Sequence, residues 1–214
     1  MDARITEERL EDIMTSRWMT NNGFQDVQVS NRQILIYATT VDSNGHNFNQ
    51  SGNCGYVAGG LLVYFARGQR GWWDLAPHGL NRELVNQIQG NRPGPSSAWD
   101  VSWALDDYFR SIGSGVRSTW WTYPAMNFNM MFDQIRSNRA VALFGNLPNA
   151  SIREQPKTHH AVVVHRMTRA YSRSLLGIRT YRDHILWAHY GWSPRFNNQE
   201  LHRSLVTLGS LLWI

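Results

Sequence analysis

The residues of this chain best suited to chemistry are its single cysteine, Cys54, and two histidines about a hundred positions later, His159 and His160. Cys54 follows a polar stretch and opens an apolar segment, so a helix is expected to begin there. A thiol in the first turn of a helix faces unpaired backbone N–H groups and the positive end of the helix dipole, and both favour the thiolate. The alternative for a lone thiol is a buried cysteine that packs as a small hydrophobic residue.

The two histidines begin a strand-like run that continues through Val164. An imidazole titrates near neutral pH, so it can take a proton from a thiol and later return it to a leaving group. Because side chains alternate across a strand, only one of the two histidines can face Cys54. Where the thiol and one imidazole meet in the fold, the imidazole would take the thiol proton, the sulfur would attack a carbonyl carbon, and departure of the protonated leaving group would leave a thioester.

The composition narrows the class of protein. The 214 residues, 42% of them hydrophobic, are enough for one sizeable domain with a packed core, and a single cysteine excludes an internal disulfide. The net charge of +5 comes from scattered arginines without an RNA- or DNA-binding motif, so nucleic acid is not the expected partner. The histidines lack metal-site spacing and no nucleotide-binding loop occurs, so we expect no metal and no cofactor.

The sequence contains no obvious membrane or targeting segment. No window approaches the ~20 apolar residues of a membrane span. The N-terminus is charged and lacks the apolar region of a signal peptide. Such a chain is either intracellular or the mature domain of a longer precursor. In the second case it would be a secreted or delivered domain.

Apolar periodicity predicts helices mainly in the first two thirds of the chain. Residues 54–67 carry apolar side chains on one face, and the two mid-helix glycines, Gly59 and Gly60, suggest that another backbone packs closely there. The other predicted helices cover residues 6–20, 80–89, 98–112 and 126–138, and a short strand is predicted over residues 33–38.

From Arg139 the pattern changes to strands, which we predict over residues 140–145, 161–167, 175–181, 184–190 and 205–214. Helices followed by antiparallel strands favour an α+β fold with a helical lobe and a sheet lobe. We therefore expect a single domain over residues 1–214. Within it, residues 1–40 form an N-terminal helix and strand extension, 41–138 a mainly helical lobe, and 139–214 a mainly antiparallel sheet lobe.

Four segments resemble bacterial papain-like cysteine peptidases, above all the peptidase-like domains related to bacteriocin-leader peptidases, with streptopain and staphopain as more distant relatives. Asn53-Cys54-Gly55, running into an apolar helix, resembles the nucleophile segment. His160-Ala161-Val162-Val163-Val164 resembles the histidine strand. Ile135 to Leu143 resembles the helix-to-strand segment before it, and Ile185 to Trp192 the strand after it. The likeness covers residues 47–214 and implies a papain-like fold with the active site in the cleft between the lobes.

The resemblance implies a role for each candidate site residue. Cys54 would be the nucleophile and His160, rather than His159, the base, because the family places its histidine directly before a small residue and a valine run. Gln50 would add a side-chain donor to the oxyanion hole beside the backbone N–H of Cys54, although it lies closer to the cysteine than the papain spacing. Trp192 resembles the tryptophan that shields the catalytic hydrogen bond from water.

The third member of the site departs from the family pattern. Where the family usually has Asn or Asp, this chain has His189. Its imidazole can accept a proton from His160 and orient it, but it offers no fixed negative charge. Asp183, at the far end of the same predicted strand, is the carboxylate alternative.

We therefore predict a cysteine peptidase that hydrolyses peptide or isopeptide bonds through Cys54 and His160 without a cofactor. The same scaffold supports amidases, deamidases and acyl transferases, and the departure at His189 leaves a non-catalytic binding module as the alternative from another class. A basic single domain without a visible signal favours, as a hypothesis, a bacterial toxin or effector released from a larger protein. Its partners would be a protein or peptide substrate and an inhibitor or immunity protein.

Overall fold

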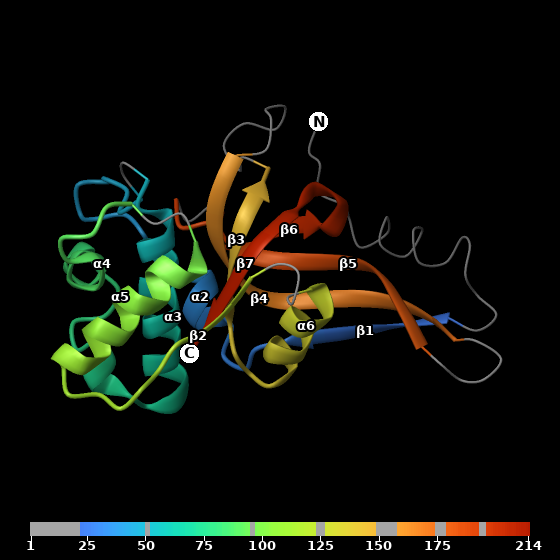
Figure 1. The fold of residues 1–214 in the computed structure, drawn as a ribbon, viewed down its shortest axis with the longest axis horizontal. Helices are drawn as coiled ribbons and strands as arrows, with labels where there is room; N and C mark the ends of the chain where they lie inside the picture. Colours follow the sequence, from blue (N-terminus) through green and yellow to red (C-terminus); the bar gives the residue numbers. More distant parts are fainter. Residues whose placement is uncertain are drawn as a thin grey trace.

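A computed structural model describes residues 22–49, 52–94, 97–122, 127–148, 158–173, 179–192 and 196–214. Figure 1 shows a group of helices packed beside a twisted antiparallel sheet. The predicted α+β class is confirmed at this level. The helix predicted over residues 6–20 lies outside the described residues.

The helical part is built around α3 (Cys54–Arg70), which is buried from Gly55 to Val63 without interruption. A helix buried all round must be enclosed by its neighbours. A Cβ at Gly59 would lie 3.1 Å from Val101 Cγ1, and one at Gly60 would lie 3.3 Å from Val85 Cγ2. The two glycines therefore allow side chains of α4 (Arg82–Gln89) and α5 (Ala98–Ser111) to approach the axis of α3 closely.

The start of α3 differs from the starts of α4, α5 and α6 (Phe128–Arg136). The side chains of Asn81, Ser97 and Asn127 cap α4, α5 and α6, respectively. Asn53 occupies the N-cap position of α3 but makes no side-chain cap hydrogen bond. The first N–H groups of α3 therefore have no side-chain acceptor at the cap. None of the described helices has the length and apolarity to cross a membrane.

The described strands form a seven-stranded sheet in the order β2-β7-β3-β4-β5-β6, with β1 paired to β4 as well. Every pairing is antiparallel. The strands are β1 (Asn22–Gln28), β2 (Thr119–Thr122), β3 (Val141–Leu147), β4 (Thr158–Arg173), β5 (Arg179–His189), β6 (Gln199–His202) and β7 (Thr207–Trp213).

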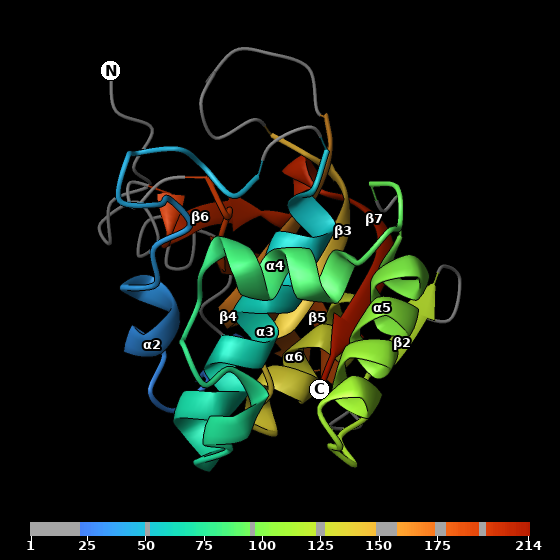
Figure 2. The same cartoon turned by 90° about the vertical axis from the view of Figure 1, so that its left-hand side faces the viewer.

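The long strand β4 joins two halves of this sheet. From Thr158 to Val164 it pairs with β3, and from Arg166 to Ser172 it pairs with β1 along the same edge. The register with β5 shifts between Val164 and Arg166, and beyond this point β1, β4 and β5 extend away from α3, α4 and α5, while α6 packs against β1 and β4 (Figure 1). Because α3 packs against β3 and β4, the half of β4 that carries His160 is the half beside the helices (Figure 2).

The structure corrects the sequence predictions at several elements. Residues Gln33–Ile36 form a short helix, α2, and not a strand, since a short apolar run does not by itself distinguish the two. The strands predicted over 175–181 and 184–190 are, in the described residues, one strand with a bulge at Asp183. Strands β1, β2 and β6 were not predicted, and β2 exposes all four of its side chains, so it lacks the alternation that marks a strand.

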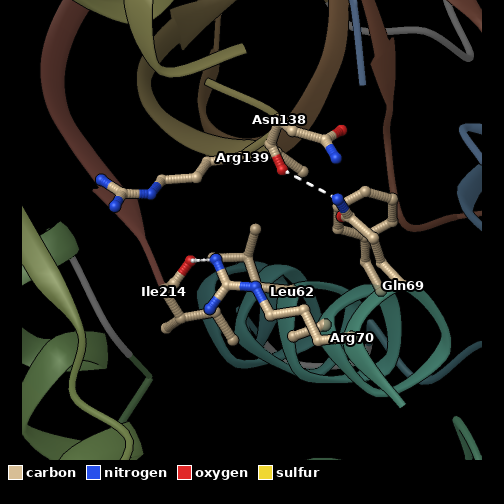
Figure 3. A pocket seen from close by; sticks show the side chains of 9 residues that line it. Leu62, Gln69, Arg70, Asn138, Arg139 and Ile214 are labelled. Atoms are coloured by element: carbon tan, nitrogen blue, oxygen red, sulfur yellow. Dashed lines mark hydrogen bonds between the residues drawn. The ribbon is translucent and has the colours of Figure 1, made fainter. Parts of the chain in front are cut away.

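Two side chains tie the C-terminal end of α3 to the sheet (Figure 3). Gln69 Nε2 donates to the carbonyl oxygen of Asn138 at 3.2 Å, and Arg70 Nη2 donates to the carbonyl oxygen of Ile214 at 3.3 Å. Asn138 in turn accepts the N–H of Ser30 through Oδ1 at 2.6 Å. These contacts hold one end of α3 in place against the sheet, while its first turn meets β4.

Buried histidines make the stability of this fold depend on pH. Burial lowers the pKa of His165 from 6.5 to about 3, and burial also lowers the pKa of His184 from 6.5 to about 4. Between about pH 4 and pH 6.5 the unfolded chain therefore binds more protons than the folded chain. Stability that is fully present above pH 6.5 is lost as the pH falls through this window.

We expect the free energy of unfolding, measured by urea denaturation, to fall by on the order of 2 kcal/mol for each of these two histidines between pH 7 and pH 4.5. The variant His165→Gln should show a smaller decrease, because it lacks one of the titrating rings. The exposed His78 provides the control: His78→Gln should keep the full decrease. Equal decreases in His165→Gln and the wild type would contradict a contribution of His165 to the pH dependence of stability.

Candidate active site

Cys54 is the first residue of α3, as predicted, and it faces β4. Its side chain is partly buried, and the backbone N–H of Ala161 in β4 lies close enough to the sulfur to lower the pKa of the thiol. The N–H groups of Gly55 and of Cys54 itself also act on the sulfur. The thiol therefore lies against the peptide group that links His160 to Ala161.

His160 is buried next to this peptide group and has a defined tautomer. A carbonyl oxygen can only accept a hydrogen bond, so the 3.0 Å contact between His160 Nε2 and the oxygen of Tyr190 places a proton on Nε2. In the neutral imidazole, Nδ1 then carries the lone pair and is the basic atom. In the described part of the chain, Cys54 and His160 are neighbours through the Ala161 amide and share no direct side-chain hydrogen bond.

Aromatic rings cover the imidazole of His160. The ring centroid of Trp192 lies 4.7 Å from that of His160, and the centroid of Tyr190 lies 5.6 Å from it. The main chain of Trp192 is held by Asn47, whose Nδ2 donates to its carbonyl oxygen. The contact between Trp192 and His160 that the sequence suggested is present, and it keeps water from part of the imidazole.

His189 lies on the other face of the sheet from His160. It pairs with Val163, and paired residues share a face, whereas residues three apart on a regular strand point to opposite faces. Its Nε2–H donates to the carbonyl oxygen of Ala38 at 3.2 Å, and its Nδ1 accepts the N–H of Gly191 at 2.9 Å. Both ring nitrogens have partners, so the predicted hydrogen bond between His160 and His189 is not formed.

His189 instead supports the turn that orients His160. Through the N–H of Gly191 it holds the residue directly after Tyr190, whose carbonyl oxygen accepts from His160. Gly191 has φ of +73°, and a Cβ there would lie 3.0 Å from Val57 Cγ1 on the first turns of α3. The orienting group is thus a main-chain carbonyl, which sequence analysis could not find because it has no side-chain signature.

The other residues that the sequence suggested for the site, His159 and Asp183, are both exposed. His159 is exposed and pairs with Asn146 of β3, so His160 is the buried histidine of the two. Asp183 is exposed, has φ of +48°, and is the extra residue of a bulge in β5 near Arg169, well along the strand from His189. Asp183 therefore does not supply a carboxylate beside His160. Gln50 lies outside the described residues.

The backbone around Cys54 can stabilise negative charge. The N–H groups of Cys54 and Gly55 act on the sulfur from the uncapped start of α3, where the helix dipole is positive. A carbonyl carbon bound to the sulfur would place its oxygen within the same region of donors. This is the arrangement that an oxyanion requires.

Burial sets the protonation of the resting pair. Burial raises the pKa of the Cys54 thiol above 9.0, and the three nearby N–H groups lower it by less. Burial lowers the pKa of His160 from 6.5 to about 4, although the carbonyl of Tyr190 acts in the opposite direction. Both groups are therefore neutral at pH 7. The N–H groups at the helix start lower the thiol pKa in the predicted direction, but burial outweighs them and the net pKa is raised.

The site has no cluster suited to a metal ion: in the ranges that the structure describes, no three His, Cys, Asp or Glu side chains gather closely enough to bind one. Comparison with known protein families finds none that matches the chain. No curated protein matches it either. The function is therefore inferred from the geometry of Cys54, His160 and the turn beside them.

Replacing Gly191 by alanine should destabilise the protein more than replacing another glycine with positive φ, such as Gly113. Gly191→Ala combines a positive φ with a new Cβ 3.0 Å from Val57 Cγ1, whereas at Gly113, with φ of +69°, a Cβ would meet nothing within 4 Å. We expect both variants to lose about 1 kcal/mol of unfolding free energy from backbone strain, and Gly191→Ala to lose about 1 kcal/mol more from crowding. Equal losses in urea denaturation would contradict the close contact with α3.

Removing the ring of Trp192 should expose His160. We expect Trp192→Ala to raise the pKa of His160 from about 4 toward 6.5, because less desolvation opposes its protonation. The imidazole proton shifts in NMR spectra, followed above pH 4.5, would then show His160 titrating in the variant and not in the wild type. Trp121→Ala removes an exposed tryptophan of β2 and is the control. Identical His160 titrations in Trp192→Ala and wild type would refute the shielding role.

Proposed function

We propose that the chain is a thiol-dependent hydrolase with a papain-like fold that cleaves peptide or isopeptide bonds. The observation that carries the proposal is the meeting of Cys54, at the uncapped start of α3, with the peptide group of β4 between His160 and Ala161. A nucleophile, a base with a fixed tautomer and backbone donors for an oxyanion then share one place in the fold.

The architecture supports the papain-like part of the proposal. A central helix starts at the cysteine, an antiparallel sheet carries the histidine, and the two meet where α3 packs on β4. The strand after the histidine, β5, returns to the site and ends at the turn with Tyr190 and Trp192. This order of elements agrees with the family that the sequence resembles.

The proposed reaction starts from a neutral pair. As the sulfur of Cys54 attacks the substrate carbonyl, Nδ1 of His160 takes the thiol proton, and the Tyr190 carbonyl keeps its hydrogen bond to Nε2–H of the resulting imidazolium. The N–H groups at the start of α3 bind the oxyanion. Nδ1 then protonates the leaving amine, a thioester remains on Cys54, and water attacks it with Nδ1 again acting as the base. With ammonia or another amine as leaving group or acceptor, the same steps describe amidase, deamidase or acyl-transfer chemistry.

A second function is favoured by a specific observation. The thiol pKa is raised and the thiol makes no direct hydrogen bond to His160, which is also what a non-catalytic papain-like binding module would have. In that case the surface beside Cys54 and Trp192 would hold a peptide without cleaving it. Delivery as a bacterial toxin or effector, with an immunity protein as partner, remains a proposal that builds on the hydrolase.

Turnover of internally quenched peptides and of an isopeptide-linked substrate tests the hydrolase. We expect kcat/KM to fall by about 100-fold or more in both Cys54→Ser and His160→Gln, because each removes a reacting group. His159→Gln changes the exposed neighbour on the same strand and should keep wild-type turnover.

Full turnover in Cys54→Ser would exclude the mechanism. If the wild-type protein binds peptides without cleaving any of them, and Cys54→Ser binds the same peptides with unchanged affinity, the chain is a binding module and not a hydrolase.

A further inference from the structure

A second site lies at the opposite end of α3 from Cys54. Gly71, with φ of +66°, ends the helix, and the chain turns into the short 3₁₀ helix η1 (Trp73–Leu75). Between this turn and residues 112–116 is a surface pocket of about 400 Å³, within the range of small-molecule sites. At 1.5 Å per residue, the helix separates the pocket from Cys54 by about 25 Å, so the two are different sites.

Two exposed tryptophans form the apolar wall of this pocket. Trp72 and Trp73 line it, and they are 37% and 58% exposed. Two large apolar rings that share one exposed surface beside a hollow mark a candidate interaction site. Ile112, on the other side of the pocket, is 38% exposed and adds to the same surface.

The rings are held in place from behind by arginines of α3. The guanidinium of Arg70 lies 4.5 Å from the ring centroid of Trp72, and that of Arg67 lies 4.7 Å from the centroid of Trp73. Arg70 is itself held by its hydrogen bond to the carbonyl oxygen of Ile214 (Figure 3). Neither arginine lines the pocket, so the two guanidinium groups fix the rings without occupying the space beside them, and the arrangement is organised before a ligand arrives.

Polar groups complete the lining and narrow the ligand chemistry. Asp74 is the charged residue among the described residues that line the pocket, and Ser114 adds a hydroxyl. The carboxylate disfavours an anion, while Arg67 and Arg70 behind the rings disfavour a cation. A neutral ligand with one apolar face and several hydroxyl donors suits aromatic faces beside a carboxylate and a hydroxyl. Pyranose rings have this character, because C–H groups cover a face and hydroxyls surround the edge.

We propose that this pocket binds a neutral oligosaccharide. One pyranose ring stacks on Trp73, the more exposed of the two tryptophans, and its hydroxyls donate to the carboxylate of Asp74. The site would hold a glycan or glycosylated partner while Cys54 remains accessible at the other end of α3. The proposal does not depend on the hydrolase.

Isothermal titration calorimetry with chitohexaose, maltohexaose and xylohexaose tests the proposal, with AMP and spermidine as the anionic and cationic probes. We expect at least one hexasaccharide to bind, and Trp73→Ala to weaken that binding by about tenfold or more, as truncation of an aromatic anchor does. Asp74→Asn should weaken it by a smaller factor. Trp103→Ala removes a tryptophan of similar exposure (56%) on α5, outside the pocket lining, and should leave binding unchanged.

Cys54→Ser should bind the hexasaccharide as the wild type does, so failure of the hydrolase and failure of this site give different results. Circular dichroism melts confirm that the Trp73 and Asp74 variants remain folded. The proposal is overturned if none of the three hexasaccharides binds, if binding survives Trp73→Ala, or if AMP or spermidine binds in a Trp73-dependent manner and the hexasaccharides do not.

Discussion

The hydrogen bond from His160 Nε2–H to the carbonyl oxygen of Tyr190 is the interaction on which the candidate site depends. It fixes the tautomer of the imidazole and leaves Nδ1 as its basic atom. The carbonyl is held by its own turn, since His189 binds the N–H of Gly191 and Gly191 packs on α3. Helix, strand and turn therefore position one another around Cys54, and a main-chain carbonyl holds the imidazole where the proposed papain-like site would have a side-chain amide or carboxylate.

Burial gives this site a different resting state from a thiolate–imidazolium pair. The raised pKa of Cys54 and the lowered pKa of His160 have the same cause, which is loss of solvent around both groups. In the proposed reaction, proton transfer would therefore accompany nucleophilic attack and not precede it. The same burial that keeps the pair neutral also strengthens the interaction between the backbone donors of α3 and a developing oxyanion, because little water screens it.

Sequence analysis predicted α3 to α6 within a few residues because apolar periodicity and capping residues are local signals. It also placed Cys54 at a helix start and His160 on a strand. It did not predict β2 or β6, because a short strand is defined by its partner elsewhere in the chain, as β2 is by β7. The role of the Tyr190 carbonyl and the raised thiol pKa were not predictable for a similar reason. Both arise from tertiary packing, and neither requires a particular residue type that the sequence would show.

The central claim is that His160 acts as the base for Cys54, and the rate of iodoacetamide alkylation at pH 7 tests it most directly. If Nδ1 of His160 takes the thiol proton as the sulfur attacks, Cys54 in the wild type should react about tenfold or more faster than in His160→Gln, with His159→Gln equal to wild type. Equal alkylation rates in the wild type and His160→Gln, rising together only toward the alkaline pKa of the thiol, would show that Cys54 is an ordinary buried cysteine and would contradict the account.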